Sequence, residues 1–209
     1  MKLYDTPLAP NPRRVRWVMA EKGIEDIEVV NLELIKGDHR APDYLAKTGL
    51  AHVPALELDD GVVLTESIAI ARYLESRYPE PNLFGRDPEE TAVIEMWMRR
   101  AELLVANPFM QWVRHTHPAL AALEPPNPAV AEYNQAGGMK GLTVLNTRLA
   151  GRDWLAADRV TIADIVAFVG LDFSRLIRFR APAELANVVR WADAMRARPA
   201  AKAGVASVG

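Results

Sequence analysis

The sequence predicts two structural parts, an α/β half at the N-terminus and an all-helical half at the C-terminus. In the first half, apolar runs follow the order strand, helix, strand and then strand, strand, helix. In the second half, the apolar residues recur at helical spacing throughout. A βαβ unit followed by a ββα unit is the order of a thioredoxin-like domain. We therefore predict a thioredoxin-like domain over residues 1–79, a linker over 80–87 and an all-α domain over 88–209.

Composition limits the class of protein. Half of the 209 residues are hydrophobic, and 25 basic against 27 acidic residues give a net charge of −2. A nucleic-acid-binding protein would show a basic excess, so no nucleic-acid partner is expected. The chain has no cysteine, so it supplies neither a disulfide nor a thiol nucleophile, and any thiol chemistry must come from a ligand. No metal site is expected.

The sequence shows no signal for a membrane. Its first ten residues, MKLYDTPLAP, lack the apolar core of a signal peptide. No run approaches the roughly 18 apolar residues of a membrane-spanning helix. We therefore expect a soluble, cytoplasmic protein without a membrane partner.

The thioredoxin-like half opens with a short strand at Lys2–Asp5 and a helix that ends before Gly23. Asn11 is a preferred N-cap residue and the proline after it suits the first helical position, so we expect Asn11 to cap this helix. Residues 27–34 are predicted as the second strand. A polar loop with a short helical piece follows over residues 36–47.

A strand–turn–strand–helix stretch organises the rest of this half. Val53 precedes Pro54 and is therefore expected to be extended, at the start of an alternating strand. The Asp60-Gly61 turn and a second apolar run complete a hairpin. Helical spacing begins after Glu66 and Ser67, which places both residues at the mouth of a helix. Free N–H groups and the helix dipole favour an anion there.

The helical half contains two strong helix starts. Asp87 is a capping residue with a proline after it, and Glu90 stands three positions on. The Asn107-Pro108 pair interrupts this run, so the helix is expected to kink or restart there. Thr161 and Asp164 are placed to form a capping box, with Asp in place of the usual Glu or Gln.

Two more helices are predicted, one from about residue 129 to 150 and a last one over residues 182–198. Three glycines, at positions 137, 138 and 141, weaken the middle of the first by about 1 kcal/mol each relative to alanine. Either this helix breaks at the glycines, or another segment packs closely against its backbone.

Two separated stretches resemble the cytosolic glutathione transferases. The Val-Pro-Ala-Leu segment at 53–56, the Asp-Asp-Gly hairpin and the Glu-Ser pair at 66–67 are similar to the glutathione-binding half of that family. The Val-Thr-Ile-Ala-Asp segment at 160–164 is similar to the capping motif of its C-terminal domain. The two stretches occur in the family's order, and the resemblance covers nearly the whole chain. It therefore implies the glutathione transferase fold.

The resemblance implies a glutathione site in the thioredoxin-like domain. It makes Pro54 a cis proline, and it assigns the backbone of Val53 to the cysteinyl part of glutathione. It assigns Glu66 and Ser67 to the γ-glutamyl end.

The resemblance also implies the remaining partners. His39 and His52 would meet the glycyl carboxylate of glutathione, although two solvated loop histidines are the competing interpretation. Glutathione would be the co-substrate, a hydrophobic small molecule the second substrate, and the protein a homodimer with a role in detoxification.

Activation of the thiol is where this sequence departs from the family. A free thiol has a pKa of about 8.5, so little of it is ionised at neutral pH. The family's usual Ser or Thr falls on Ala9, which has no donor, as in an atypical yeast and bacterial branch without the usual Tyr, Ser or Cys. Asn11, near the start of the first helix, and His115, at the end of the kinked helix, are the candidate catalytic residues. His115 and His117 as two surface histidines are the competing interpretation.

The implied reaction is conjugation of glutathione to a hydrophobic electrophile. A non-catalytic binding protein of the same fold is one alternative, which Ala9 favours, and a glutathione-dependent isomerase or dehalogenase is another. Four apolar residues are expected to line the second-substrate pocket or, alternatively, to belong to the core: Phe109, Met110, Trp112 and Phe173. Residues expected on a solvated helix face are Arg13, Arg14 and Arg16.

Overall fold

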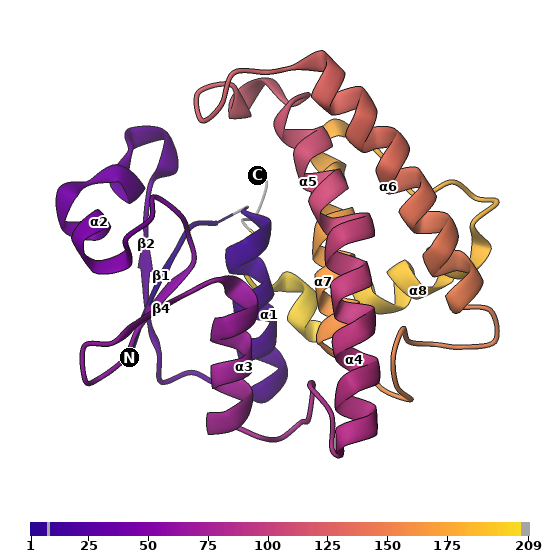
Figure 1. The fold of residues 1–209 in the computed structure, drawn as a ribbon, viewed down its shortest axis with the longest axis horizontal. Coiled ribbons are helices and arrows are strands. Elements are labelled where there is room, and N and C mark those ends of the chain that lie inside the picture. Colours follow the sequence, from indigo (N-terminus) through magenta and orange to yellow (C-terminus); the bar gives the residue numbers. More distant parts are fainter. Residues whose placement is uncertain (8, 206–209) are drawn as a thin grey trace. The chain divides into compact units, whose positions relative to one another are not determined.

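The structure, a computed structural model, describes residues 1–7 and 9–205. It forms two compact units, one of Met1–Pro81 with residues 199–205 and one of Asn82–Arg198 (Figure 1). Residues 199–205 thus belong to the N-terminal unit, whereas the predicted division assigned them to the helical domain. The reason is a contact that sequence patterns do not reveal: the Nη2 of Arg13 donates to the carbonyl oxygen of Ala201 over 2.9 Å.

The N-terminal unit is built on a four-stranded mixed sheet in the order β2-β1-β3-β4. Strand β1 (Lys2–Asp5) runs parallel to β2 (Glu28–Asn31) and antiparallel to β3 (Ala55–Glu57), and β3 pairs with β4 (Val63–Thr65). The predicted thioredoxin-like order is therefore confirmed.

Three α-helices complete this unit: α1 (Pro10–Lys22), α2 (Pro42–Thr48) and α3 (Ser67–Arg77). Figure 1 shows α1 and α3 on one side of the sheet and α2 on the other. The core between α1, α3 and the sheet consists of fully buried aliphatic side chains, each of which stabilises the fold by about 1.5–3 kcal/mol. They include Leu3, Val15, Val18, Leu56, Ile70 and Leu74.

Two predicted boundaries in this unit are wrong. Helix α1 begins at Pro10 with Ala9 as its N-cap, so Asn11 is the second helical residue and not the cap. Pro10 accounts for the shift, because its fixed φ suits the first helical position. The predicted strand over 27–34 is shorter, since the chain leaves β2 and enters a 3₁₀ turn at Leu34–Lys36 that ends at Gly37, with φ 87°.

The second unit is all-helical, as predicted. Its helices are α4 (Pro88–Ala101), the π-helical segment Glu102–Ala106, α5 (Asn107–Arg114), α6 (Pro128–Arg148), α7 (Ile162–Phe173) and α8 (Ala186–Ala197). Short 3₁₀ turns lie at Pro118–Leu120 and Ser174–Ile177. Within the described ranges, none of the helices has the length and apolar character needed to span a bilayer.

Helix α7 is apolar all round and forms the centre of this unit. The predicted capping box at its start is confirmed, because the Oδ2 of Asp164 accepts from the backbone N–H of Thr161 over 3.0 Å. The other carboxylate oxygen, Oδ1, accepts from the N–H of Leu155 at 2.9 Å and from the indole N–H of Trp191 at 3.0 Å. The fully buried Asp164 therefore joins three separate segments.

The glycines of α6 allow close packing, and the helix does not break. A Cβ at Gly138 would lie 3.0 Å from the ring of Phe109, and one at Gly141 would overlap the carbonyl oxygen of Leu104. Leu104 belongs to the π-helical segment at the predicted interruption. Since Pro108 has no N–H to donate to that carbonyl, the local winding loosens and α6 approaches the exposed backbone.

Candidate functional site

The hairpin brings the two halves of the predicted site to the same end of the sheet. Ala55 of β3 is paired with Thr65 of β4. Pro54, immediately before β3, and Glu66, immediately after β4, therefore flank the same end of the hairpin. The Val53–Pro54 peptide bond is cis, in agreement with the resemblance.

Glu66 and Ser67 form the mouth of α3. Glu66 is the N-cap residue and is exposed, with φ 67° and ψ 116°. A positive φ is unfavourable for a residue with a Cβ, and such strain clusters at functional sites. Ser67 is the first helical residue and is 5% exposed. The backbone N–H groups of this first turn have no intrahelical acceptors, so they can bind an anion.

The expectation of a solvated arginine face on α1 is wrong. Arg13 and Arg14 are buried, with exposed fractions of 5% and 2%. The Nη1 of Arg14 donates to the Oγ of Ser67 over 3.4 Å. Arg16 is half-buried and pairs with the buried carboxylate of Asp5. Helical spacing does not separate these positions clearly from a solvated face, because α1 is covered on several sides.

The loop before the cis proline is anchored to α2. The hydroxyl of Tyr44 donates to the backbone carbonyl oxygen of His52 over 2.5 Å. Burial raises the pKa of Tyr44 to about 12, so the phenol remains protonated and continues to donate. The Tyr44 hydroxyl thus holds the chain one residue before Val53, the residue assigned to the cysteinyl part of the ligand.

The two histidines assigned to the glycyl carboxylate differ in environment. His39 is 7% exposed, and its Nδ1 has no hydrogen-bond partner in the described part of the chain. Burial lowers the pKa of His39, and the nearby Arg40 and His52 lower it further. His52 is exposed. His39 is therefore a neutral imidazole near pH 7, and it would bind a carboxylate through a hydrogen bond.

On the side assigned to the thiol, Ala9 is the N-cap of α1 and makes no side-chain capping bond. Asn11 is half-buried, and its Oδ1 is buried without a hydrogen-bond partner among the residues described. An unsatisfied buried amide oxygen is unfavourable, so it is suited to binding a donor. The start of α1 therefore offers the dipole and one amide oxygen that has no hydrogen-bond partner among the described residues.

His115 lies in the helical unit, directly after α5, and its side chain is 6% exposed. Its Nε2 lies 3.9 Å from the Oε1 of Glu124, which also accepts through Oε2 from Arg114 at 3.2 Å. The Nδ1 atoms of His115 and His117 have no partner in the ranges that the structure describes. The interpretation of His115 as a solvated surface histidine is therefore wrong, because the side chain is buried.

The four residues predicted to line a second pocket divide into two pairs. Phe109 and Phe173 are core residues, with exposed fractions of 0% and 8%, whereas Met110 and Trp112 are half-buried. Phe179, which was not predicted, has its ring centroid 5.3 Å from that of Phe109 and 5.0 Å from that of Trp112. An aromatic residue between two arginines was its only local signal.

No group of three or more potential metal ligands occurs among the described residues. Arg14 and Tyr44, which contact Ser67 and His52, were not predicted as site residues. Sequence spacing gives no signal for either contact, because each depends on how distant segments pack.

Comparison with known proteins bears on the same residues. The model of the glutathione S-transferase N-terminal domain matches residues 3–82, and that of the C-terminal domain matches residues 104–199. The chain belongs to the glutathione S-transferase family. Curated relatives match along nearly the whole chain. Glutathione S-transferase 2 of Saccharomyces cerevisiae is 35% identical over 97% of this chain and 88% of its own length. These matches show that the protein is a glutathione transferase.

Solved structures of this family share the fold. The crystal structure of Gtt2 from Saccharomyces cerevisiae has a TM-score of 0.89 at 34% identity and covers 97% of this chain and 99% of its own. Maleylacetoacetate isomerase of Pseudomonas aeruginosa is 44% identical, but over only 42% of each chain. The predicted resemblance to a yeast and bacterial branch of glutathione transferases is confirmed.

Proposed function

We propose that this glutathione transferase joins the thiol of glutathione to a hydrophobic electrophile. The single observation that carries the proposal is the mouth of α3 beside the cis Val53–Pro54 bond, held together by the Ala55–Thr65 pairing. The extended backbone of Val53 pairs with the cysteinyl unit. Glu66 and Ser67 hold the γ-glutamyl end, the carboxylate on the α-ammonium and the hydroxyl on the α-carboxylate.

The glycyl end of glutathione is assigned to the loop histidines. His39 donates a hydrogen bond to the glycyl carboxylate, and His52 lies near enough to influence its titration. The ligand thus spans from α3 to the 3₁₀ turn that carries His39, Asp38–Arg40. The cysteinyl sulfur lies between the two ends.

The chemical step is a displacement or addition by the thiolate. The thiol proton passes to a base, and a sulfur electron pair forms the new bond to carbon. In a displacement, the bond from that carbon to the leaving group breaks and the leaving group takes its electron pair. In an addition, the π pair of the attacked double bond moves to the adjacent atom, which then takes up a proton. Lowering the thiol pKa by two units takes about 2.7 kcal/mol of preferential thiolate stabilisation. The N-terminus of α1 supplies about 1–2 kcal/mol. A second contributor is therefore needed.

We assign that contribution to His115, directly or through a water molecule, with Asn11 as the alternative. The buried Nδ1 of His115 has no partner in the described ranges, so it is available as an acceptor. In the resemblance on which this assignment rests, the end of the kinked helix overhangs the thiol. A histidine is suited to accept a proton near neutral pH.

Met110, Trp112 and Phe179 supply half-buried apolar surface for the electrophile. The alternatives are a glutathione-dependent isomerase or dehalogenase, consistent with the partial match to an isomerase, and a carrier without catalysis, consistent with Ala9. Turnover with glutathione against a panel of activated aryl halides, peroxides and cis-dienoic acids separates them. Glutathione binding without turnover on any member of the panel would favour the carrier.

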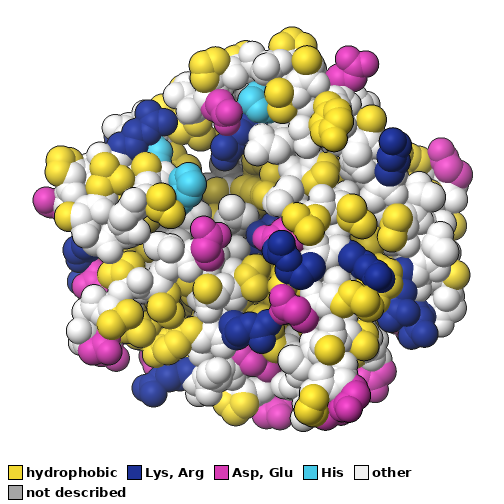
Figure 2. Space-filling view, viewed as in Figure 1, with side chains coloured by type: hydrophobic (Ala, Val, Ile, Leu, Met, Phe, Trp, Pro, Cys, Tyr) yellow, Lys and Arg dark blue, Asp and Glu magenta, His cyan; other side chains and the backbone are white. Residues whose placement is uncertain are grey.

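The homodimer is proposed to form through α4. Apolar residues near the start of the helical unit do not all face outward, because Phe84 and Trp97 are 4% and 7% exposed and belong to the core. On α4, Val93 and Met96 are 37% and 41% exposed, and Leu103 in the π-helical segment that follows is 53% exposed. Figure 2 shows hydrophobic and charged side chains intermixed on the face that carries α4. A two-fold axis would bring this stripe against its own copy.

The proposed location is the cytoplasm, where the glutathione pool keeps thiols reduced. A role in detoxification follows from the proposed conjugation of hydrophobic electrophiles. Localisation of a fluorescent fusion of the full chain tests the first point. Survival of a deletion strain on electrophilic compounds tests the second.

A further inference from the structure

A buried arginine stands behind the mouth of α3. Arg14 of α1 is 2% exposed, and its Nη1 donates to the Oγ of Ser67 over 3.4 Å. Burial of a guanidinium is unfavourable unless hydrogen bonds and opposite charges replace the lost hydration. A buried guanidinium directly behind an anion-receptive helix start is unlike an ordinary surface arginine.

The direction of the hydrogen bond fixes the role of the Ser67 hydroxyl. A guanidinium can only donate, whereas a hydroxyl has one donor and two acceptor positions. Ser67 must therefore accept from Arg14, and its own hydrogen is left to donate to a ligand. The backbone N–H groups of the first turn of α3 are also donors. The Ser67 hydroxyl, the first-turn N–H groups and the Arg14 charge thus all favour an acceptor with negative charge, whereas the exposed carboxylate of Glu66 at the same helix start favours a cation.

We propose that Arg14 is a positioning residue that makes the mouth of α3 selective for a carboxylate over a neutral group of the same shape. The inference rests on the proposed function, in which Ser67 binds the α-carboxylate of the γ-glutamyl unit. Arg14 orients the Ser67 hydroxyl and adds positive potential behind it. Without Arg14, the hydroxyl can rotate and accept as well as donate, so a carboxamide would bind nearly as well as a carboxylate.

The same helix provides a matched control. Arg13 is 5% exposed, but its Nη2 donates to the carbonyl oxygen of Ala201 at 2.9 Å and its guanidinium lies 5.7 Å from the ring centroid of Trp17. Substitution of Arg13 therefore removes an equally buried arginine from α1 without removing the bond to Ser67. Both substitutions are expected to lower thermal stability, and only that of Arg14 should change ligand selectivity.

The test compares two ligands by calorimetry on the full chain: glutathione, and the isosteric analogue in which the α-carboxylate of the γ-glutamyl unit is a carboxamide. The wild type should bind glutathione at least about tenfold more tightly, the effect of one charge-assisted hydrogen bond. Arg14→Gln should reduce this ratio to within about threefold. Arg14→Lys, which retains the charge, should preserve part of it, and Arg13→Gln should leave it unchanged.

Each result decides between specific alternatives. If Arg14→Gln weakens both ligands equally and retains the wild-type ratio, the arginine is structural and the inference is wrong, while the glutathione site stands. If the wild type binds neither ligand, the proposed function fails first. Ser67→Ala provides a second measurement should Arg14→Gln not fold, because it leaves Arg14 in place and removes the hydroxyl that Arg14 orients. An unchanged ratio in Ser67→Ala would also overturn the inference.

Discussion

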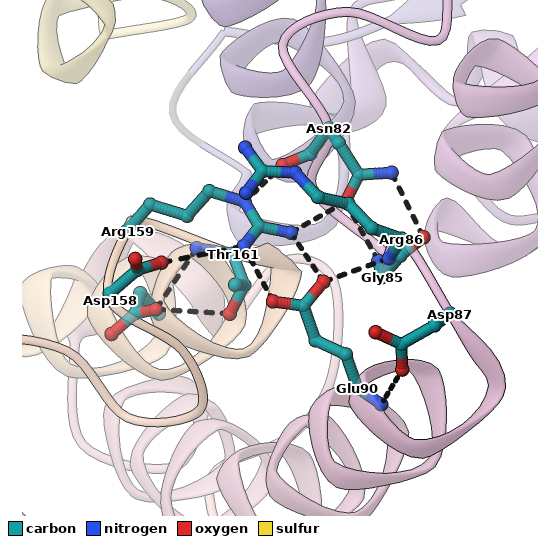
Figure 3. A network of polar contacts seen from close by, with 9 residues as sticks. Asn82, Gly85, Arg86, Asp87, Glu90, Asp158, Arg159 and Thr161 are labelled. Carbon is teal, nitrogen blue, oxygen red and sulfur yellow. Dashed lines mark hydrogen bonds and ion pairs between the residues drawn. The ribbon is translucent and has the colours of Figure 1, made fainter.

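Arg159 holds the carboxylate of Glu90 with two hydrogen bonds, from Nη1 to Oε1 at 2.6 Å and from Nη2 to Oε2 at 2.8 Å (Figure 3). The two residues are 69 positions apart. Arg159 also donates from Nε to the backbone carbonyl of Asn82 at 3.0 Å and from Nη2 to its side-chain oxygen at 2.7 Å. One guanidinium therefore joins the loop before α7, the start of the helical unit and the first turn of α4.

The first prediction concerns this pair. Glu90→Gln should lower the free energy of unfolding at pH 7 by about 2 kcal/mol, because a partly buried, hydrogen-bonded ion pair loses the negative charge of one partner. Glu89→Gln, an exposed neighbour in the same helical turn, should change it by less than about 0.5 kcal/mol. Chemical denaturation of both variants measures the difference.

Acid titration of stability provides an independent check on the same pair. The hydrogen bonds from Arg159 lower the pKa of Glu90 from 4.5 to about 2. A lowered pKa means that the unfolded state binds protons first, so the stabilisation is complete above pH 4.5 and is lost as the pH falls toward 2. Wild-type stability should therefore fall more steeply in this window than that of Glu90→Gln. Equal slopes would contradict the assignment.

The second prediction concerns glutathione binding at the mouth of α3. Ser67→Ala should weaken binding by about 1 kcal/mol or more, because it removes a donor to a carboxylate. Calorimetry on the wild type and the variant measures this loss. A wild type without measurable affinity for glutathione would eliminate the proposed site.

The third prediction separates stability from binding at Glu66. Its positive φ is unfavourable for any residue with a Cβ. Glu66→Gly should therefore leave stability unchanged or raise it by up to about 1 kcal/mol, while glutathione binding weakens. Glu66→Ala, which keeps the Cβ and loses the carboxylate, should weaken binding without the gain in stability. Thermal unfolding and calorimetry of both variants test this, and equal stability of the two variants would argue against backbone strain.

The fourth prediction concerns activation of the thiol. Ultraviolet titration of the enzyme–glutathione complex reports the thiolate, and the wild type should bring the bound thiol below the solution pKa of about 8.5. His115→Ala should raise the thiol pKa and slow turnover at neutral pH, and Asn11→Ala should do so less. His117→Ala is the matched control. If His115→Ala leaves both quantities unchanged, the histidine has no role in activation, and a bound thiol that titrates as in free solution would favour the carrier.

The fifth prediction concerns assembly. Met96→Glu places a charge in the exposed stripe of α4 and should convert the proposed dimer to monomer in light scattering. Tyr133→Glu, at an exposed apolar side chain of α6 that is 80% accessible, should leave the mass unchanged. A wild type that remains monomeric at all concentrations would rule out the dimer.

The sequence predicted the elements whose signals are local. Thr161 and Asp164, which form the capping box of α7, are three residues apart. The side chain of Asp87 accepts from the backbone N–H of Glu90, also three residues on. Neither motif depends on the rest of the chain. The cis Val53–Pro54 bond and the mouth of α3 were also located correctly, because they lie within one hairpin and the helix that follows it. These features account for most of the fold and for the glutathione-binding half of the candidate site.

The parts that were missed depend on distant packing. Arg14 was expected in solvent, although it lies behind Ser67, and the hydroxyl of Tyr44 reaches the backbone of His52 from another helix. The N-cap of α1 was misplaced by two residues, because Asn11 and Pro10 give competing signals and local preference does not rank them. Periodicity identifies a buried face only when one side of a helix is covered, and α1 is covered on several sides.

The π-helical segment has a consequence for the geometry of the helix that follows it. The N–H of Asn107 bonds to the carbonyl of Glu102, five residues back, so this turn contains more chain than a regular one. Each residue of an α-helix advances the rotation about its axis by about 100°. Because the wide turn absorbs its additional residue, deletion of one residue within Glu102–Ala106 would restore regular winding and leave Trp112 and His115 on nearly the same side of the helix. The same deletion in a regular turn would rotate both by about 100°. The wide turn therefore keeps the angular setting of both side chains nearly independent of the additional residue that it contains.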